Sequence, residues 1–249
     1  MPFTEQRVLS IRPWSDKTFS FTTTRPDGFE FENGQFVTLG LRHNGKLIAR
    51  AYSIVSTNDV DYLEFLSIHV PDGPFTSQLV NVREGENLLI NSKPTGSLTL
   101  KYILPGRNLY LLSTGTGLAP FICLMRDPEV YQHYEKVIIV HTVRTQGELA
   151  YRDEIEALSS ERLLYVPSVT REPFETNERV SDLFRSGALF TKLALPAADP
   201  AYDRVMLCGN PHMLVEMRAY LETNGWTMTS YKGVSNFTVE KAFVLHNEA

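Results

Sequence analysis

The first hundred residues carry the hydrophobic pattern of short β-strands. Residues 34–39 alternate apolar and polar side chains, and residues 62–70 do so over part of their length. Turn-forming pairs such as Asn44-Gly45 separate these runs. Short alternating strands at this spacing predict a small antiparallel barrel. A short helix that Thr76 opens is expected to interrupt it.

A different pattern begins after about residue 101. Residues 108–113 and 137–140 are apolar runs, which are typical of strands buried on both faces. Strands and helices then alternate, which predicts βαβ units and a parallel sheet. We therefore divide the chain into a barrel domain, residues 1–100, and an α/β domain, residues 101–249. The other predicted strands cover 163–169 and 204–208, and the predicted helices cover 119–125, 148–158, 180–190 and 212–223.

Composition limits the classes of function. The chain of 249 residues has a net charge of −5, which argues against a nucleic-acid binder. Its two cysteines are too few for a disulfide framework or a four-cysteine cluster. The sequence starts without the features of a signal peptide, and no run approaches the roughly 20 apolar residues that span a bilayer. We expect a cytoplasmic protein without membrane insertion.

The six histidines show no metal-ligand spacing, so we predict no metal site. His133, His141 and His212 are expected to be surface or structural residues. Asp153, Glu154 and Glu156 are expected on a solvated helix face, and residues 239–244 are expected to form an edge strand that closes the sheet.

A glycine loop follows the strand at 108–113. Gly115, Thr116 and Gly117 lie between that strand and the next helix, and Pro120 suits the first helical turn. Glycines allow a phosphate to approach the backbone closely, and a helix N-terminus offers it unpaired N–H groups. A tight strand-to-helix turn is the alternative explanation. The pattern favours phosphate binding, although the spacing differs from the common dinucleotide fingerprint.

Two barrel segments carry related chemistry. Residues 50–53, at the start of a predicted strand, read Arg-Ala-Tyr-Ser. An arginine suits a pyrophosphate, a tyrosine can cover an aromatic ring, and a serine can hydrogen-bond a ring nitrogen. Residues 73–77 place two hydroxyls at a helix start, where they could cap the helix or meet a phosphate. Taken singly, an ordinary surface strand and helix capping are the more frequent explanations.

Charged and sulfur groups follow the predicted sheet strands. Ligands bind at the carboxyl ends of strands in open α/β sheets, and Arg144, Arg171 and Arg179 lie there. Arginines favour the extra phosphate of NADP, whereas an acidic residue would favour NAD. Each arginine alone could belong to a solvated loop. Cys208 also ends a strand and could touch a ligand, although a buried inert cysteine is the common case.

Taken together and in order, these motifs resemble those of the bacterial ferredoxin/flavodoxin–NADP(H) reductases. The resemblance covers nearly the whole chain and implies an antiparallel six-stranded β-barrel that binds FAD. A parallel-sheet α/β domain flanked by helices would then bind NADP, and the C-terminal tail would return to the flavin. The implied cofactors are FAD and NADP(H), and the implied partners are ferredoxin and flavodoxin. The segments that carry the resemblance are residues 50–53, 71–77, 114–120, 170–172, 208–211 and 239–244.

The resemblance also implies residue roles. Ser53, Cys208 and Glu240 would position and tune the reacting rings, and none need act as a strong acid or base. Thr116 would lie at the junction of both cofactors. The other implied FAD contacts are Arg50, Ala51, Tyr52, Leu66, Ile68, Val70, Pro74, Phe75, Thr76 and Ser77. The implied nucleotide contacts are Gly115, Gly117, Val143, Arg144, Thr170, Arg171, Arg179, Gly209, Asn210 and Met213.

The C-terminus resembles one subgroup of that family, in which an Ala-Phe-Val segment covers the flavin. Ala242 stands where the plastid-type enzymes carry a tyrosine, and the chain continues through Phe243 to Ala249. The resemblance implies that Ala242 and Phe243 contact the flavin. The tail would then act as a gate, since it must shift for nicotinamide to reach the flavin.

Two other functions stay open at this point. One is an NADPH-dependent flavin diaphorase that serves a small molecule or an oxygenase. The other is a catalytically silent flavoprotein that docks on a larger redox complex. Because the resemblance requires no subunit interface, we expect a monomer.

Overall fold

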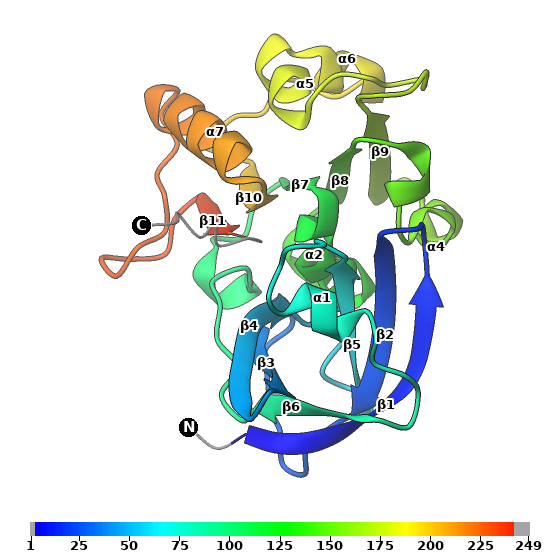
Figure 1. Cartoon of the computed structure of the whole chain (residues 1–249). Helices are drawn as coiled ribbons and strands as arrows, with labels where there is room; N and C mark the ends of the chain where they lie inside the picture. Colours follow the sequence, from blue (N-terminus) through cyan, green and yellow to red (C-terminus); the bar gives the residue numbers. More distant parts are fainter. Residues whose placement is uncertain (1–2, 242–249) are drawn as a thin grey trace.

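The computed structural model describes residues 3–241, which form an antiparallel barrel and a parallel sheet flanked by helices (Figure 1). The predicted fold class is therefore confirmed. None of the helices within residues 3–241 has the length and apolar character needed to cross a bilayer.

The barrel strands follow the order β4-β3-β6-β1-β2-β5. A bridge between Ile54, just after β4, and Phe65 of β5 joins the two ends of this sheet. Val37 and Leu39 alternate along β3 and point into the barrel core, as the apolar pattern predicts. The strands are β1 (Phe3–Pro13), β2 (Thr18–Thr24), β3 (Phe36–His43), β4 (Lys46–Ser53), β5 (Tyr62–Ile68) and β6 (Asn87–Asn91), with the helix α1 (Thr76–Leu79) before β6.

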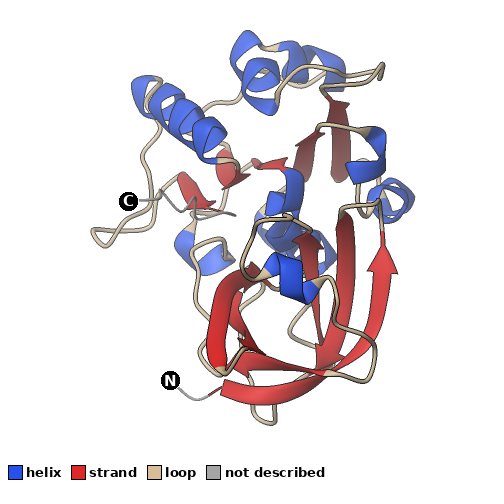
Figure 2. Cartoon of the chain, in the orientation of Figure 1, coloured by secondary structure: helices blue, strands red, loops and turns tan. Residues whose placement is uncertain are grey.

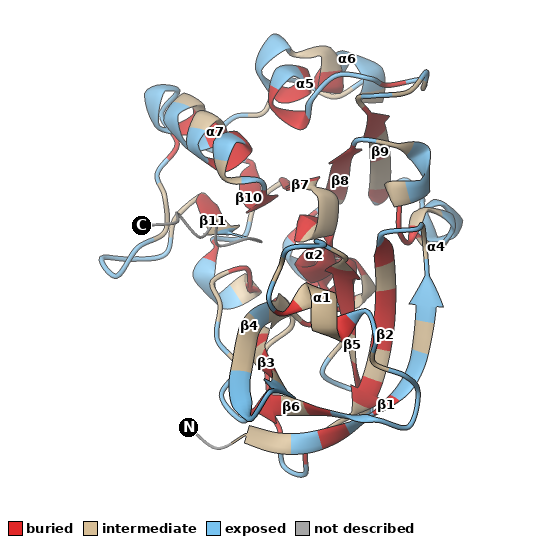
Figure 3. Ribbon diagram, viewed as in Figure 1, coloured by how far each residue is buried: buried red, intermediate tan, exposed pale blue. Residues whose placement is uncertain are grey.

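The second sheet is wholly parallel, in the order β11-β10-β7-β8-β9. Leu109 and Leu111 pack with residues of α2, α3 and α4, and Tyr110 and Leu112 pack with residues of α5, α6 and α7. Helices lie on both sides of this largely buried sheet (Figures 2 and 3). Both faces are therefore buried, which explains the uninterrupted apolar runs. The strands are β7 (Asn108–Thr114), β8 (Lys136–Val143), β9 (Leu163–Val169), β10 (Arg204–Gly209) and β11 (Phe237–Lys241).

Two of the predicted helices of this domain differ in the structure, and the short helix at 130–133 was not predicted. The helix expected from residue 148 begins at Arg152, because Tyr151 has a left-handed φ of 59°. The helix expected over 180–190 is two helices, because Gly187 has a φ of 82°. The helices are α2 (Ala119–Arg126), α3 (Val130–His133), α4 (Arg152–Leu158), α5 (Val180–Ser186), α6 (Ala188–Leu193) and α7 (Pro211–Thr223), with short 3₁₀ turns η1 (Leu100–Tyr102), η2 (Gly115–Leu118) and η3 (Gln146–Glu148).

The two domains share one hydrophobic core. Val55, Leu66 and Leu98, from the barrel side, belong to the same buried cluster as Leu118 and Phe121 at the start of α2. Burial of a continuous apolar surface is the main force that holds such elements together. The helix α2 is therefore part of the contact between the domains as well as part of the α/β domain.

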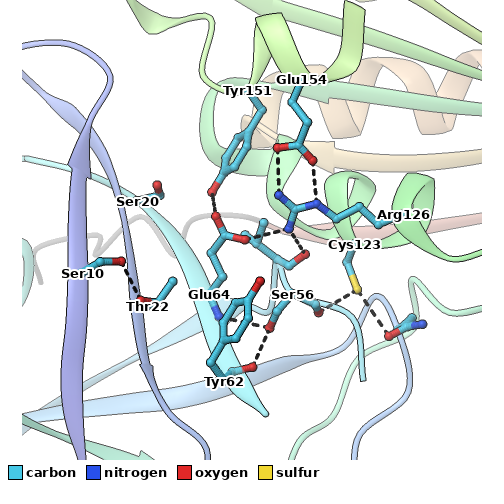
Figure 4. Close-up of polar contacts among 12 residues, drawn as sticks. Ser10, Ser20, Thr22, Ser56, Tyr62, Glu64, Cys123, Arg126, Tyr151 and Glu154 are labelled. Carbon is cyan, nitrogen blue, oxygen red and sulfur yellow. Dashed lines mark hydrogen bonds and ion pairs between the residues drawn. The ribbon is translucent and has the colours of Figure 1, made fainter. Parts of the chain in front are cut away.

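A partly buried ion-pair network reinforces this contact (Figure 4). At the end of α2, Arg126 donates through Nη1 to Glu64 Oε2 (2.7 Å) and to the Val55 carbonyl (3.2 Å). Its Nε and Nη2 donate to the two carboxylate oxygens of Glu154, at 2.7 and 2.9 Å. The Tyr151 hydroxyl donates to Glu64 Oε1 at 2.8 Å. The expectation that Glu154 lies on a solvated helix face was wrong, because Arg126 binds it.

We predict that Arg126→Met will lower the free energy of unfolding by about 3 kcal/mol or more, because two carboxylates of low exposure lose their cation. Urea denaturation followed by fluorescence would measure the change. Arg218→Met is the matched control, since Arg218 forms an exposed pair with Glu222 within α7. It should cost no more than about 0.5 kcal/mol. Equal losses in the two variants would contradict a special role of Arg126 in joining the domains.

Candidate functional site

The glycine loop, η2, packs closely against the end of β10. A Cβ atom on Gly117 would lie 2.4 Å from the Cys208 carbonyl oxygen, and one on Gly209 would lie 2.2 Å from Thr114 Oγ1. Only glycine fits at these two positions. A Cβ atom on Gly115 would instead meet nothing within 4 Å. One side of the loop is thus fixed against β10, and the Gly115 side is open to a ligand.

A second set of bonds joins the loop after β7 to the loop after β10. The Asn210 backbone N–H donates to Thr114 Oγ1 at 2.7 Å. The Asn210 side chain accepts from the His212 N–H at 2.8 Å and so caps α7. Gly209 and Asn210 therefore lie beside the glycine loop. Met213 instead packs almost fully buried in the core below α7.

Cys208 and Glu240 lie opposite each other on the neighbouring strands β10 and β11. Burial raises the pKa of the Glu240 carboxyl to about 7, although a backbone N–H donor partly opposes this shift. Burial and the nearby Glu240 raise the pKa of the Cys208 thiol well above its usual value. The thiol therefore stays protonated at neutral pH, and the carboxyl group can exchange a proton there.

Glu240 is also the point where the sheet meets the barrel. Its Oε2 accepts from the Ser97 N–H at 3.0 Å. A Cβ atom on Gly96 would lie 3.1 Å from the same oxygen and 3.3 Å from the Phe36 ring. Phe36 pairs with Ser53 between β3 and β4. Cys208 and Glu240 are therefore neighbours, and Ser53 is connected to them only through Phe36 and Gly96. Gly96 and Ser97 were missed, because a bond from a backbone N–H leaves no signal in the residue type.

Residues 50–53 end β4, whereas the sequence placed them at the start of a strand. That prediction was wrong because His43 pairs directly with Lys46, so the strand begins earlier. The Tyr52 hydroxyl hydrogen-bonds Ser67 Oγ at 2.9 Å. Burial raises the pKa of Tyr52 to about 12, so this ring stays neutral. Arg50, Tyr52 and Ser53 are half-buried and Ala51 is exposed at this barrel rim.

The other predicted contacts of the barrel are dispersed. The Tyr52 ring centroid lies 5.6 Å from that of Phe75, which is itself buried in the barrel core. Thr76 does not cap α1, because its hydroxyl donates to the Val70 carbonyl at 3.0 Å. Leu66 belongs to the core shared by the domains. Of the remaining predicted contacts, Ile68, Ser77 and Thr116 are half-buried, and Val70 and Pro74 are exposed.

The loops after β8 and β9 bind each other. The Arg171 N–H donates to the Arg144 carbonyl at 2.9 Å. The Thr170 hydroxyl donates to the carbonyl of Val143, which is buried, at 3.1 Å. Both arginines are exposed, and so is Arg179, which precedes α5. The fold therefore brings Arg144 and Arg171 together at one edge, where they can bind an anion.

The remaining predictions concern cysteines, histidines and the tail. Cys123 and Cys208 are both free thiols. His133 and His212 are exposed, whereas His141 is fully buried. Within residues 3–241, no three His, Cys, Asp or Glu side chains gather as a metal site would require. The expected edge strand is present as β11 up to Lys241. The predicted contacts at Ala242 and Phe243 lie outside the described residues.

The donor set at this junction suits two nucleotide cofactors. The barrel rim offers an arginine, a neutral tyrosine ring and a serine hydroxyl. The sheet offers an open glycine loop and two neighbouring arginines at one edge. Between them lie a protonated thiol and a carboxyl group that titrates near neutral pH. Such a site can hold phosphates at its ends and an uncharged ring system in its centre.

Comparison with known proteins assigns both domains. Residues 5–100 match the oxidoreductase FAD-binding domain, and residues 111–219 match the oxidoreductase NAD-binding domain. The chain is 48% identical over 250 residues to a ferredoxin–NADP reductase of Pseudomonas aeruginosa, covering 96% of this chain and 97% of that protein. It is 43% identical to a flavodoxin/ferredoxin–NADP reductase of Rhodobacter capsulatus, covering 96% and 93%.

A solved structure supports the same assignment. It is a ferredoxin NADP⁺ reductase from Neisseria gonorrhoeae with bound FAD and NADP, and it superposes with a TM-score of 0.93 at 30% identity. The match covers 98% of this chain and 100% of that one.

We predict a distinct pH dependence of stability from Glu240. Its pKa in the folded chain, about 7, lies above the ordinary 4.5, so the folded state binds this proton more tightly than the unfolded state. The stabilisation is complete below pH 4.5 and is lost as the pH rises through 7. Glu240→Gln cannot titrate, so the parent should lose up to roughly 3 kcal/mol more than this variant between about pH 5 and pH 8.

Urea unfolding at the two pH values would measure this difference. Glu161→Gln, at an exposed position, is the control and should follow the parent. If Glu240→Gln shows the same pH dependence as the parent, the carboxyl group is not held in the neutral form.

Proposed function

The chain belongs to the ferredoxin–NADP reductase family, and from this premise we propose that it moves electrons between NADP(H) and ferredoxin or flavodoxin through a bound FAD. The observation that carries this proposal is the junction of the two domains. There Cys208 and Glu240 of the sheet lie beside Gly96 and Ser97 of the barrel side, and Phe36, the strand partner of Ser53, packs near Gly96. A nicotinamide and a flavin must meet at such a junction to react.

The barrel rim would hold FAD. Arg50 would bind the pyrophosphate, because a guanidinium forms charge-assisted bonds with phosphate oxygens. The neutral ring of Tyr52 would pack against the isoalloxazine, and the Ser53 hydroxyl would hydrogen-bond its edge. When bound, FAD takes up two electrons with a hydride and can release them one at a time. The protein contributes orientation and electrostatics to that chemistry.

Cys208 and Glu240 would shape the centre of the site. The protonated thiol of Cys208 adds bulk without charge, so it can pack beside a nicotinamide without an electrostatic penalty. Glu240 Oε2 already accepts from Ser97, which leaves Oε1 to hold a proton near neutral pH. Neither group needs to act as a strong acid or base. The main contribution of the protein would be to hold the two rings at reactive distance, about 3–3.5 Å.

The sheet edge would select NADP(H) over NAD(H). The loops after β8 and β9 are joined by the bond from the Arg171 N–H to the Arg144 carbonyl, so the two residues lie at one edge of the sheet. Two guanidinium groups there would bind the 2′-phosphate, which only NADP(H) carries. Arg179, before α5, would add to the same positive region.

The proposal also covers the carrier protein, the domain boundary, the cellular location, the oligomeric state and the tail. The carrier is ferredoxin or flavodoxin, since both names occur among the relatives. We propose a boundary between the FAD and NADP domains near residue 100, a cytoplasmic location and a monomeric state. We also propose that Ala242 and Phe243 contact the flavin and that the tail acts as a gate.

Spectroscopy and rapid kinetics would test the proposed function. The purified protein should show the absorption bands of an oxidised flavin, and NADPH should bleach them faster than NADH does. In a stopped-flow instrument, the reduced protein should then pass electrons to ferredoxin or flavodoxin. A colourless protein that is inert with NADPH would contradict the proposal. Reduction by NADPH without transfer to either carrier would favour a diaphorase that serves a small molecule.

We predict that Arg144→Ala and Arg171→Ala will each weaken NADPH binding by about 10- to 100-fold, because a charge-assisted contact to phosphate is lost. Binding of NADH should change little. Dissociation constants for both nucleotides, from flavin absorbance titrations, would measure the difference. Arg218→Ala, an exposed arginine on α7, serves as the control for a general loss of positive charge. Equal weakening of NADPH and NADH would rule out the 2′-phosphate assignment.

A further inference from the structure

His141 is a buried histidine that the proposed reaction does not use. It lies in β8, is fully buried, and its Nε2 is 3.0 Å from the carbonyl oxygen of Gly115. A carbonyl oxygen only accepts hydrogen bonds, so Nε2 must carry the hydrogen. Burial lowers the pKa of His141 to about 4, so the ring is neutral at physiological pH.

A histidine at position 141 is less favourable than an apolar residue if its role is packing alone. Its Nδ1 atom is buried without a hydrogen-bond partner among the described residues. A buried unpaired polar atom costs roughly 1–3 kcal/mol. Ile139 and Val143, two residues away on either side and on the same face of β8, are apolar. An apolar residue at 141 would avoid the unpaired nitrogen, so the bond to Gly115 must bring a separate benefit.

The bond controls the direction of one peptide unit in the glycine loop. A trans peptide is planar, so its C=O and N–H groups point in opposite directions. With the Gly115 carbonyl held inward by His141, the N–H of Thr116 is turned to the other side. Gly115 itself borders open space, because a Cβ atom added there would meet nothing within 4 Å. The loop therefore presents an N–H group outward as long as the His141 bond lasts.

The contact also completes a set of restraints on this loop. On the β10 side, Gly117 meets the Cys208 backbone, and Thr114 accepts from the Asn210 N–H. On the β8 side, the contact is the one from His141. The loop is thus held from both neighbouring strands. Without His141, the Gly115 carbonyl would lose its bond to β8, and the β10 contacts would hold only Thr114 and Gly117.

We propose that His141 is a positioning residue for pyridine-nucleotide binding, which fixes the Gly115–Thr116 peptide so that its N–H faces the pyrophosphate of NADP(H). This inference rests on the proposed function. It assigns His141 to the pyrophosphate alone, and leaves the 2′-phosphate to Arg144 and Arg171. The two regions can therefore be tested with different ligands.

The test uses His141→Leu, which fills the space without a donor, and His141→Gln, whose amide can donate to the Gly115 carbonyl. Each FAD-loaded variant is titrated with NADP⁺ and with adenosine 2′-phosphate, which lacks the pyrophosphate. We expect His141→Leu to bind NADP⁺ about 3- to 10-fold more weakly, because one hydrogen bond that orients the loop is lost. Affinity for adenosine 2′-phosphate should stay unchanged, and His141→Gln should restore most of the NADP⁺ affinity.

Ser113→Ala is the matched control. Ser113 lies opposite His141 in β7 and is equally buried, but its hydroxyl donates to the Val140 carbonyl and not to the loop. Its loss should leave NADP⁺ binding unchanged. Near-UV circular dichroism and the thermal midpoint of each variant would report the general cost of a buried substitution.

The possible results distinguish a positioning role of His141 from a packing role. Loss of affinity for NADP⁺ alone, with rescue by glutamine, supports the positioning role. Unchanged NADP⁺ affinity in His141→Leu, or equal weakening of both ligands, overturns it and gives His141 a packing role. A parent protein that binds neither ligand would overturn the proposed function as well.

Discussion

The rest of the structure depends on the contact of Arg126 with Glu64 and Glu154. Arg126 ends α2, and the same helix starts directly after the glycine loop. A helix is stiff along its axis, so fixing its last residue to the barrel also sets where its first residue lies. The hydrophobic core around Leu118 presses the other end of α2 against the barrel. The position of the glycine loop relative to the barrel rim follows from these two attachments.

Charge is distributed unequally between this contact and the candidate site. The network around Arg126 is charged, and its guanidinium satisfies two carboxylates. Around Cys208 and Glu240, burial raises the pKa of both groups, and no cation within residues 3–241 opposes this shift. Below about pH 7, the centre of the junction is thus close to neutral. A neutral centre suits uncharged flavin and nicotinamide rings, whereas phosphates would be met at the edges by arginines and backbone N–H groups.

Particular residues show how far the sequence could predict this arrangement. Alternation predicted the barrel strands, and apolar runs predicted the parallel sheet, because side-chain periodicity reports how many faces of a strand are buried. The same reasoning missed the break of a helix at Gly187 and the start of α4 at Arg152, since one residue with positive φ leaves the apolar pattern intact. It also placed Glu154 in solvent, because a helix face that binds a neighbouring helix through an ion pair has the same polar pattern as a solvated face.

The sequence by itself determined the two domains, the sheet types and the residue types that the candidate site contains. Only the tertiary structure decided which of those residues meet. Glu240 binds the backbone of Ser97, which is 143 positions away, and His141 binds the backbone of Gly115, which is 26 positions away. Neither backbone partner has a side chain that signals the contact. Such pairs depend on strand order and register, which arise when both sheets pack, and no local pattern along the chain encodes them.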